Sequence, residues 1–210
     1  MNTTIIIPTI NYRPDLLERC VDSVTRTLRS DDQLAVIEGG TFAENCNAGG
    51  FRADTDTIIF LNDDTKVDQD DWIDKLLAPF HDPHVGITGC RLIYPDGKLQ
   101  HTGIYFDIDD GVLAAYNRTW DADSGPVSGV TGACLAIRTS LFRDLEGFDP
   151  EFRNGYEDVD LCLRTQQAGH TIHYVAECTL IHHESQSGPA RWDHVNHNVD
   201  RLQQLWSVTD

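Results

Sequence analysis

A short acidic cluster, Asn62-Asp63-Asp64, directly follows an apolar run over residues 57–61. β-Branched and aromatic residues in a run of this length predict a buried strand, so the cluster falls at the strand's carboxyl end. Ligands of open α/β sheets bind just outside the carboxyl ends of the strands. Carboxylate oxygens there suit a hard divalent cation, which can also hold phosphates. The cluster therefore predicts a cation site, although the same residues are also common in turns and at helix N-caps.

A second group of carboxylates, Glu157, Asp158 and Asp160, lies at the start of an amphipathic segment. Helix N-termini stabilise carboxylates, so capping accounts for this group as well, and for Asp160 it is the better interpretation. Glu157 and Asp158 come shortly after the turn-prone pair Asn154-Gly155, and a carboxylate on such a loop can face a cleft. A general base needs a carboxylate near a nucleophilic hydroxyl, and these two residues are the candidates for that role.

A pair of histidines, His182 and His183, follows the apolar run 179–181. A histidine at a strand end is a reasonable metal ligand, whereas most single histidines are simply packed or exposed. Adjacent strand residues face opposite ways, so at most one of the two can point at a given site.

The elements that must position these groups alternate between strands and helices in the first half of the chain. Strands are expected over residues 4–7, 34–37, 57–61 and 85–89, and helices over 14–28, 41–52 and 70–80. This order is typical of a parallel sheet with crossover helices. After a Pro-Gly turn at 94–98, the second half is expected to hold strands within 103–118 and over 132–138, 171–175 and 179–181, a mobile loop over 121–127, and helices over 140–145, 158–168 and 193–206. A single α/β domain over residues 1–210, with a mostly parallel central sheet flanked by helices, is the simplest prediction.

The composition excludes some classes of partner. The net charge is −18, from 16 Lys and Arg against 34 Asp and Glu, which argues against nucleic acid or an anionic membrane as the main partner. A site for a phosphorylated ligand in so acidic a chain would need a metal ion. The charge also suits a solvated surface with no chemical role.

Cysteine usage and hydropathy bear on location. The six cysteines occur singly with no Cys-x-x-Cys pair, which favours buried reduced thiols in a cytoplasmic protein over a zinc ribbon. The first predicted strand begins within five residues of Met1, so no signal peptide is expected. No apolar stretch approaches the length of a membrane span, so no integral membrane segment is expected.

Taken in order, these motifs resemble family 2 glycosyltransferases of the GT-A fold, in the rhamnosyltransferase-like branch. The resemblance runs from about residue 4 to residue 187, most of the chain. Six ordered segments carry it: 5–14, the first strand and donor loop; 60–65, the DXD-type metal motif; 92–103; 132–138, the floor of the acceptor site; 147–164, the region of the Glu-Asp motif; and 182–187, the closing histidine motif.

The resemblance implies a nucleotide-sugar site in the first half of the chain, residues 1–90. The residues it implies for donor binding are Pro8, Thr9, Asn11, Tyr12, Glu38, Asn47 and Asp63. Glu38 stands where the family usually has an aspartate that contacts the base, and the segment after it looks shortened. By analogy, UDP-type and dTDP-type donors are favoured over guanosine donors.

The resemblance also implies a metal site and a base. Asp64 and His182 would hold Mn²⁺ or Mg²⁺, with Asn62 in the place of the family's first aspartate and His183 as the alternative histidine. The ion would neutralise the diphosphate leaving group. Asp158 would be the general base of an inverting transfer to an acceptor hydroxyl, supported by Glu157.

The acceptor is implied to bind in residues 91–190, followed by a C-terminal helix in 191–210. Trp72, Gly132, Ala133 and Tyr156 are the implied acceptor residues; Trp72 and Trp192 would stack on sugar faces, or else pack in a core. A glycan, a protein or a small molecule is the expected acceptor, and the oligomeric state is open.

Two rival hypotheses remain at this point. A nucleotidyltransferase also combines a parallel sheet with a carboxylate-bound metal, but its usual Gly-rich, basic first loop is missing after residues 4–7. A degenerate sugar-binding or assembly module could keep the fold without catalysis. Asp158 and His182 argue against such a module, whereas Asn62 and the shortened segment after Glu38 leave it open.

Overall fold

The computed structural model describes residues 1–109, 112–184 and 193–206. The elements of the first half are β1 (Thr3–Thr9), α1 (Pro14–Thr25), β2 (Gln33–Glu38), α2 (Phe42–Gly50), β3 (Thr57–Leu61), β4 (Thr65–Lys66), α3 (Trp72–Leu77), the 3₁₀ helix η1 (Ala78–His81) and β5 (Val85–Ile93). Those of the second half are β6 (Leu99–His101), β7 (Ile104–Asp109), β8 (Val112–Asn117), β9 (Gly125–Val127), β10 (Cys134–Arg138), α4 (Thr139–Asp144), α5 (Glu157–Gln167), β11 (Thr171–His182) and α6 (Val195–Trp206).

Within the described residues, the main sheet has nine strands and is mixed, with most of its long strands parallel. Its central order is β2-β1-β3-β10-β5-β11-β4, with β6 beside β5 and β9 beside β11. β1 pairs in parallel with β2 and β3, and β5 pairs in parallel with β11. β10 runs antiparallel between β3 and β5. The carboxyl ends of β1, β3, β5 and β11 therefore meet the amino end of β10 at one edge of the sheet.

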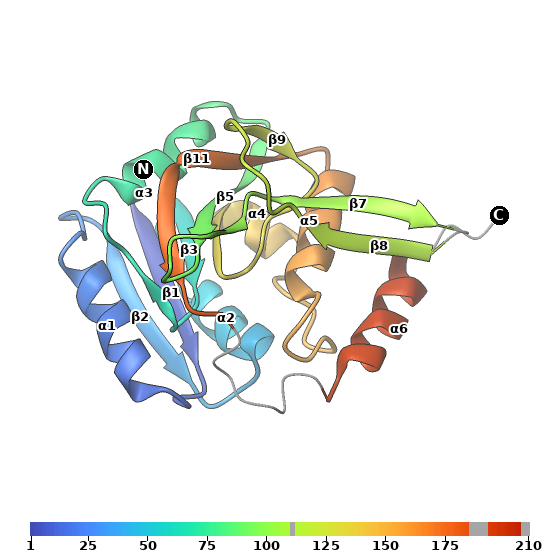
Figure 1. Cartoon of the computed structure of the whole chain (residues 1–210), viewed down its shortest axis with the longest axis horizontal. Coiled ribbons are helices and arrows are strands. Elements are labelled where there is room, and N and C mark those ends of the chain that lie inside the picture. Colours follow the sequence, from blue (N-terminus) through green and yellow to red (C-terminus); the bar gives the residue numbers. More distant parts are fainter. Residues whose placement is uncertain (110–111, 185–192, 207–210) are drawn as a thin grey trace.

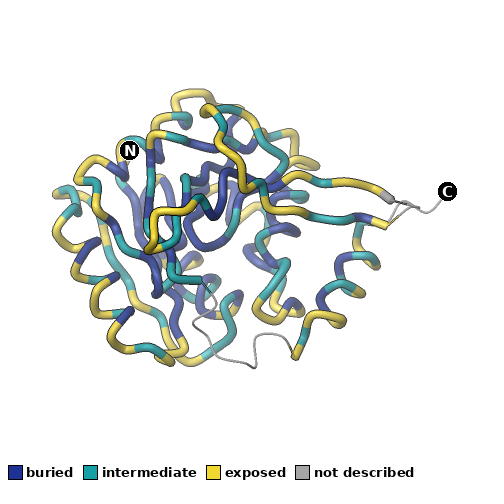
Figure 2. Tube along the Cα trace, viewed as in Figure 1, coloured by how far each residue is buried: buried dark blue, intermediate teal, exposed yellow. Residues whose placement is uncertain are grey.

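Helices cover both faces of this sheet, as the alternating pattern predicted (Figure 1). One apolar core joins the sheet to α1 and α3, through residues such as Val24 and Leu76. A second core joins the other face to α2, α4 and α5, through residues such as Cys46, Phe142 and Leu161. The central strands are almost wholly buried (Figure 2), which explains why they read as continuous apolar runs.

A two-stranded hairpin, β7–β8, extends from the sheet on the side of α6 (Figure 1). A third apolar cluster lies beneath it, where Ile104 and Leu113 pack with Val159 of α5 and Leu202 of α6. The C-terminal helix thus ties the hairpin to α5, the helix that begins with Glu157.

The structure corrects several predicted boundaries. The two strands expected over 171–175 and 179–181 form the single strand β11, which has a register shift between Val175 and Thr179. The helix expected over 70–80 ends as α3 at Leu77 and continues as η1, with Pro79 in its first turn. The loop expected over 121–127 is partly ordered as β9, which pairs with β11.

All six cysteines lie within the described residues, and all are unpaired and buried, as predicted. A cytoplasmic location stays a prediction. None of the described helices combines the length and apolar character needed to cross a bilayer.

Candidate active site

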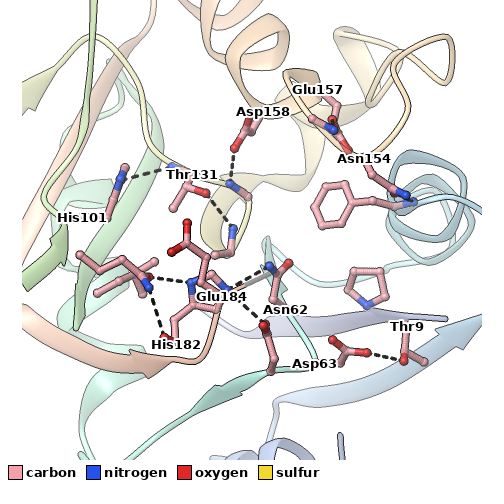
Figure 3. A pocket seen from close by; sticks show the side chains of 18 of the residues that line it. Thr9, Asn62, Asp63, His101, Thr131, Asn154, Glu157, Asp158, His182 and Glu184 are labelled. Atoms are coloured by element: carbon pink, nitrogen blue, oxygen red, sulfur yellow. Dashed lines mark hydrogen bonds and ion pairs between the residues drawn. The ribbon is translucent and has the colours of Figure 1, made fainter. Parts of the chain in front are cut away.

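A pocket of about 210 Å³ opens at the edge of the sheet where the carboxyl ends of the parallel strands gather. Its lining comes from the ends of β1, β3 and β11, from β6, from the segment before β10 and from the start of α5. In Figure 3, Glu157 and Asp158 lie on one side of the pocket and Asn62, Asp63 and His182 on the other. The structure therefore brings together all three groups that the sequence singled out.

The end of β1 is tied to the acidic cluster by Thr9. The Thr9 hydroxyl donates to Asp63 Oδ2 at 2.5 Å and accepts from the backbone N–H of Asn11 at 2.8 Å. Asn11 has a left-handed backbone, with φ of 55°. Burial raises the pKa of Asp63, an effect that the Thr9 hydrogen bond opposes. Behind them, the buried Asn45 amide donates to the Thr9 carbonyl at 3.2 Å and so fixes this loop against α2.

Asp64 and His182 form a buried pair on the floor of the pocket. Asp64 Oδ1 lies 3.1 Å from His182 Nε2, and both side chains are less than a tenth exposed. Asn62 Nδ2 lies 3.4 Å from the same ring nitrogen. A backbone bond from the His183 N–H to the Asp64 carbonyl, 3.0 Å long, holds the two strand ends in register.

The ring orientation of His182 is fixed by Gln100. The Gln100 amide nitrogen donates to the His182 carbonyl at 3.2 Å, so the amide oxygen faces His182 Nδ1 at 2.7 Å. An amide oxygen only accepts, so Nδ1 carries a proton. In the neutral ring, Nε2 then presents a lone pair toward the Asp64 carboxylate, and a proton or a cation has to lie between two such acceptors.

This donor set fits a hard divalent cation whose remaining ligands come from elsewhere. Within the residues that the structure describes, no group of three or more His, Cys, Asp or Glu side chains gathers in ligating positions. The chain offers Asp64, His182 and, after a flip of its amide, the oxygen of Asn62. Mn²⁺ and Mg²⁺ sites commonly combine one or two protein ligands with phosphate and water oxygens, so the sparse set suits an ion delivered with a diphosphate.

Asp158, the first-turn carboxylate of α5, is held mainly by backbone groups. Its Oδ2 accepts from the Gly132 N–H at 2.8 Å and its Oδ1 from the Val159 N–H at 2.9 Å. Burial raises the pKa of Asp158, whereas these hydrogen bonds and one from the Thr131 hydroxyl lower it. A carboxylate with a raised pKa that faces a pocket is suited to accept a proton.

Glu157 is also buried in the wall of the pocket, where its Oε2 accepts from the Gly155 N–H at 2.5 Å. The helix begins abruptly because Tyr156, its N-cap, adopts a left-handed backbone with φ of 72°. Glu184 completes the rim on the opposite side and accepts a 2.7 Å hydrogen bond from the Tyr94 hydroxyl.

Several predicted site residues lie elsewhere. Trp72 is wrong as a sugar-stacking residue, because it is fully buried in the core beneath α3 and its indole N–H donates to Thr27 Oγ1 at 2.8 Å. Asn47 does not line the pocket, and both ends of its amide bond the Phe148 backbone at 2.8 Å.

Other predicted residues lie at the edge of the site or beyond it. Glu38 is exposed and pairs with Thr9 at the end of β2, outside the pocket lining, and Tyr12 is 57% exposed. Tyr156 packs toward the cluster beneath the hairpin, whereas Gly132 and Ala133 do line the pocket. Trp192 lies outside the described residues.

Three buried polar lining residues were missed as site residues by the sequence analysis: Asn45, Gln100 and His101. His101 Nε2 accepts from the Thr131 N–H at 3.4 Å, and its Nδ1 donates to Asn117 Oδ1 at 3.2 Å. Burial lowers the pKa of His101 to about 4, so the ring is neutral at neutral pH. The sequence offers one signal for the last two, the adjacent polar residues Gln100 and His101 shortly after the 94–98 turn. Polar residues at such a place suggest an exposed strand, so their burial at the pocket was not predicted.

The fold and the site define a class of protein. Solved structures with the GT-A fold of glycosyltransferases superpose on nearly the whole chain. GalNAc-T7 in complex with UDP, GalNAc and Mn²⁺ matches with a TM-score of 0.72 at 17% identity, covering 98% of this chain and 48% of that one. A mannosyltransferase from Pyrobaculum calidifontis in complex with GDP-Man and Mn²⁺ matches with a TM-score of 0.69 at 14% identity, covering 99% and 65%. The predicted GT-A fold is therefore confirmed.

The chain belongs to the glycosyltransferase like family 2, whose family model matches residues 34–198. It is 34% identical to the O-antigen biosynthesis protein RfbC of Myxococcus xanthus, over 88% of this chain and 17% of RfbC. It is 26% identical to the O-antigen chain rhamnosyltransferase RfbN of Salmonella typhimurium, over 87% of this chain and 66% of RfbN. The chain thus spans less than two thirds of the length of either relative. The predicted resemblance to rhamnosyltransferase-like members of family 2 is confirmed by these matches.

Proposed function

We propose that this chain is a metal-dependent, inverting glycosyltransferase domain that moves a sugar from a nucleotide-diphosphate sugar to an acceptor hydroxyl. The observation that carries the proposal is the pairing of two sites across one pocket. On one side of the pocket, Asp64 Oδ1 and His182 Nε2 lie 3.1 Å apart. Asp158, whose pKa is raised by burial, faces the same pocket from the other side. A cation-held leaving group and a base on opposite sides of a reacting carbon are what an in-line displacement needs.

The donor half is proposed to be residues 1–90. Pro8 and Thr9 line the pocket, and Asp63 lies beside them, where it can accept from sugar or ribose hydroxyls. A UDP-type or dTDP-type donor is proposed from the family resemblance; of the two similar solved complexes, that of GalNAc-T7 holds UDP and that of the mannosyltransferase holds GDP-Man. A deoxyhexosyl or hexosyl group is the proposed cargo.

Asp64 and His182, with the amide oxygen of Asn62, are the residues proposed to hold Mn²⁺ or Mg²⁺. When bound, the ion would neutralise the charge that develops on the departing diphosphate. Asp64 supplies a carboxylate and His182 an imidazole, and Asp63 adds a second carboxylate beside them, so a bound cation would offset negative charge that otherwise repels the phosphates.

Asp158 is proposed to take the proton from the acceptor hydroxyl. As the O–H bond breaks, that oxygen forms a bond to the anomeric carbon, and the bond from this carbon to the diphosphate oxygen breaks on the opposite face. The sugar is transferred with inversion and the nucleotide diphosphate leaves. Gly132 N–H keeps one oxygen of Asp158 fixed, and Glu157 supports the adjacent wall or binds acceptor.

The acceptor half is proposed to be residues 91–190, with residues 191–210 as a C-terminal support. Gly132 and Ala133 form part of the pocket wall beside Asp158. A glycan, protein or small-molecule hydroxyl is the proposed acceptor.

Calorimetric titration of UDP and dTDP with and without Mn²⁺ tests the proposal, followed by assay of donor hydrolysis over a panel of UDP-sugars and dTDP-sugars. We expect Mn²⁺-dependent nucleotide binding that Asp64→Asn weakens at least 10-fold, since it removes a charged ligand. Asp158→Asn should retain this binding and lose turnover. Absence of nucleotide binding in the wild type would overturn the transferase proposal, and binding without any turnover would favour a degenerate sugar-binding module.

A further inference from the structure

Two consecutive buried residues of β6, Gln100 and His101, are 6% and 2% exposed and lie at the pocket. β6 is a three-residue strand that pairs with the end of β5. Successive strand residues face opposite ways, so the two side chains serve different neighbours. A buried polar side chain is costly unless it is fully hydrogen-bonded, which makes the partners of these two residues informative.

Gln100 makes two hydrogen bonds to His182, on the side of the pocket that holds Asp64. Its amide nitrogen donates to the His182 carbonyl at 3.2 Å, and its amide oxygen accepts from Nδ1 at 2.7 Å. The first bond fixes which end of the amide faces the ring, and the second then fixes the tautomer. The lone pair of Nε2 is thereby aimed at the space beside Asp64 Oδ1, 3.1 Å away.

His101 serves the base side. Its Nε2 accepts the Thr131 N–H at 3.4 Å, and its Nδ1 is held by Asn117 at 3.2 Å. Thr131 begins the short segment before β10 that cradles Asp158, through its own hydroxyl and through the Gly132 N–H. The same hydroxyl accepts from the Ala133 N–H at 3.3 Å, so the segment 131–133 is stiffened as a unit.

We propose that Gln100 and His101 are positioning residues that act on the two halves of the reaction separately. Gln100 orients His182 for the ion, and His101 orients the 131–133 segment for Asp158. This inference rests on the proposed function, because it assigns the supports of that same site. Each is proposed to act through the residues that it holds in place. Since they are adjacent in sequence, a shift of β6 would disturb both halves together, whereas single substitutions should separate them.

The test compares two substitutions at each position. Electron paramagnetic resonance measures Mn²⁺ affinity in the presence of UDP, and a kinetic assay measures kcat for donor hydrolysis at saturating Mn²⁺. Gln100→Leu removes the acceptor opposite Nδ1 and is expected to weaken Mn²⁺ binding about 10-fold or more, the usual scale for a lost outer-shell partner. Gln100→Glu keeps an acceptor oxygen there and is expected to retain more of the affinity. In Gln100→Leu, kcat should recover when Mn²⁺ is raised to saturation.

At position 101 the comparison is between two amide side chains of different length, in His101→Gln and His101→Asn. A glutamine places its terminal oxygen near the position of Nε2, so His101→Gln can still accept the Thr131 N–H. An asparagine reaches only the position of Nδ1, so His101→Asn leaves that N–H without its partner. We expect His101→Asn to lower kcat about 10-fold or more with Mn²⁺ affinity unchanged, and His101→Gln to recover most of the loss.

Circular dichroism and thermal melts show whether each variant folds. If one variant at a position does not fold, the second variant at that position still tests the proposal. Equal Mn²⁺ affinity in Gln100→Leu and the wild type would overturn the role of Gln100. Equal kcat in His101→Asn and His101→Gln, or a loss of Mn²⁺ affinity in both, would overturn the role of His101. If the wild type binds no Mn²⁺ with UDP, the proposed function fails and this inference fails with it; if the wild type binds and the variants behave alike, the inference alone is wrong.

Discussion

Replacing Asn47 tests whether this residue stabilises the fold or binds the donor. The family resemblance implies that Asn47 contacts the donor, whereas the structure shows its amide closing two 2.8 Å hydrogen bonds with the backbone of Phe148, 101 residues away. The turn before Phe148 is shaped around this amide, since a Cβ on Gly147 would lie 2.5 Å from Asn47 Oδ1. Gly147 also has φ of 75°, which a side chain would disfavour.

The expected effect of Asn47→Ala follows from those two bonds. Each net hydrogen bond contributes about 1 kcal/mol, so the loss of both should cost roughly 2 kcal/mol of unfolding free energy. For a chain of this size, about 2–4 °C of Tm accompanies each kcal/mol, which gives a drop of roughly 4–8 °C. Mn²⁺-dependent UDP affinity should stay within about 2-fold of the wild type.

Differential scanning calorimetry and nucleotide titration measure the two quantities on the same sample. Glu38→Ala is the matched control, because Glu38 is another implied donor residue outside the pocket lining and its side chain is exposed. That variant should shift the unfolding free energy by less than about 0.5 kcal/mol. A fall in UDP affinity with an unchanged Tm in Asn47→Ala would refute the structural reading and restore the donor role.

Three further outcomes are expected. Donor turnover should fall as pH drops through the raised pKa of Asp158, because the protonated carboxyl cannot accept a proton; a kcat profile that is flat in this range would contradict the base assignment. His182→Ala should abolish the Mn²⁺ dependence of UDP binding measured by titration, and an unchanged dependence would place the ion elsewhere. Trp72→Phe, which loses the bond to Thr27 and part of a fully buried side chain, should lower the unfolding free energy by about 1–3 kcal/mol in denaturant melts and leave sugar-dependent kinetics unchanged.

Local patterns in the sequence were enough to find the strand ends and their carboxylates. The run over 57–61 is buried on both faces, so its composition alone predicts a strand, and the acidic cluster has to follow at its end. Asp158 was predicted to face a cleft for a similar local reason, because it follows the turn-prone pair 154–155 at the start of a helix.

The supports of the site could not be found in this way, because their partners are distant in sequence. Gln100 meets His182 across 82 positions, and His101 meets Thr131 across 30. The prediction for Trp72 was wrong for another reason, because a tryptophan shortly after the acidic cluster 62–64 has the same sequence pattern whether it faces a sugar or the core. Only the packing of α3 against β11 and α1 decides between the two.

The reversed direction of β10 has a consequence for how this site can change over evolutionary time. Because the strand enters the sheet from the edge that holds the pocket, it presents backbone N–H groups there, and the Gly132 N–H is the one that binds Asp158. A main-chain donor survives almost every replacement of the side chain that carries it. Replacement of Ala133, which lines the pocket, can therefore alter the pocket wall while this main-chain bond to Asp158 persists. Thr131 and Gly132 are less free to change, because the Thr131 hydroxyl also bonds Asp158 and a Cβ on Gly132 would lie 2.9 Å from the Phe42 ring. A proline at position 132 would in addition remove the main-chain donor itself, because proline has no N–H.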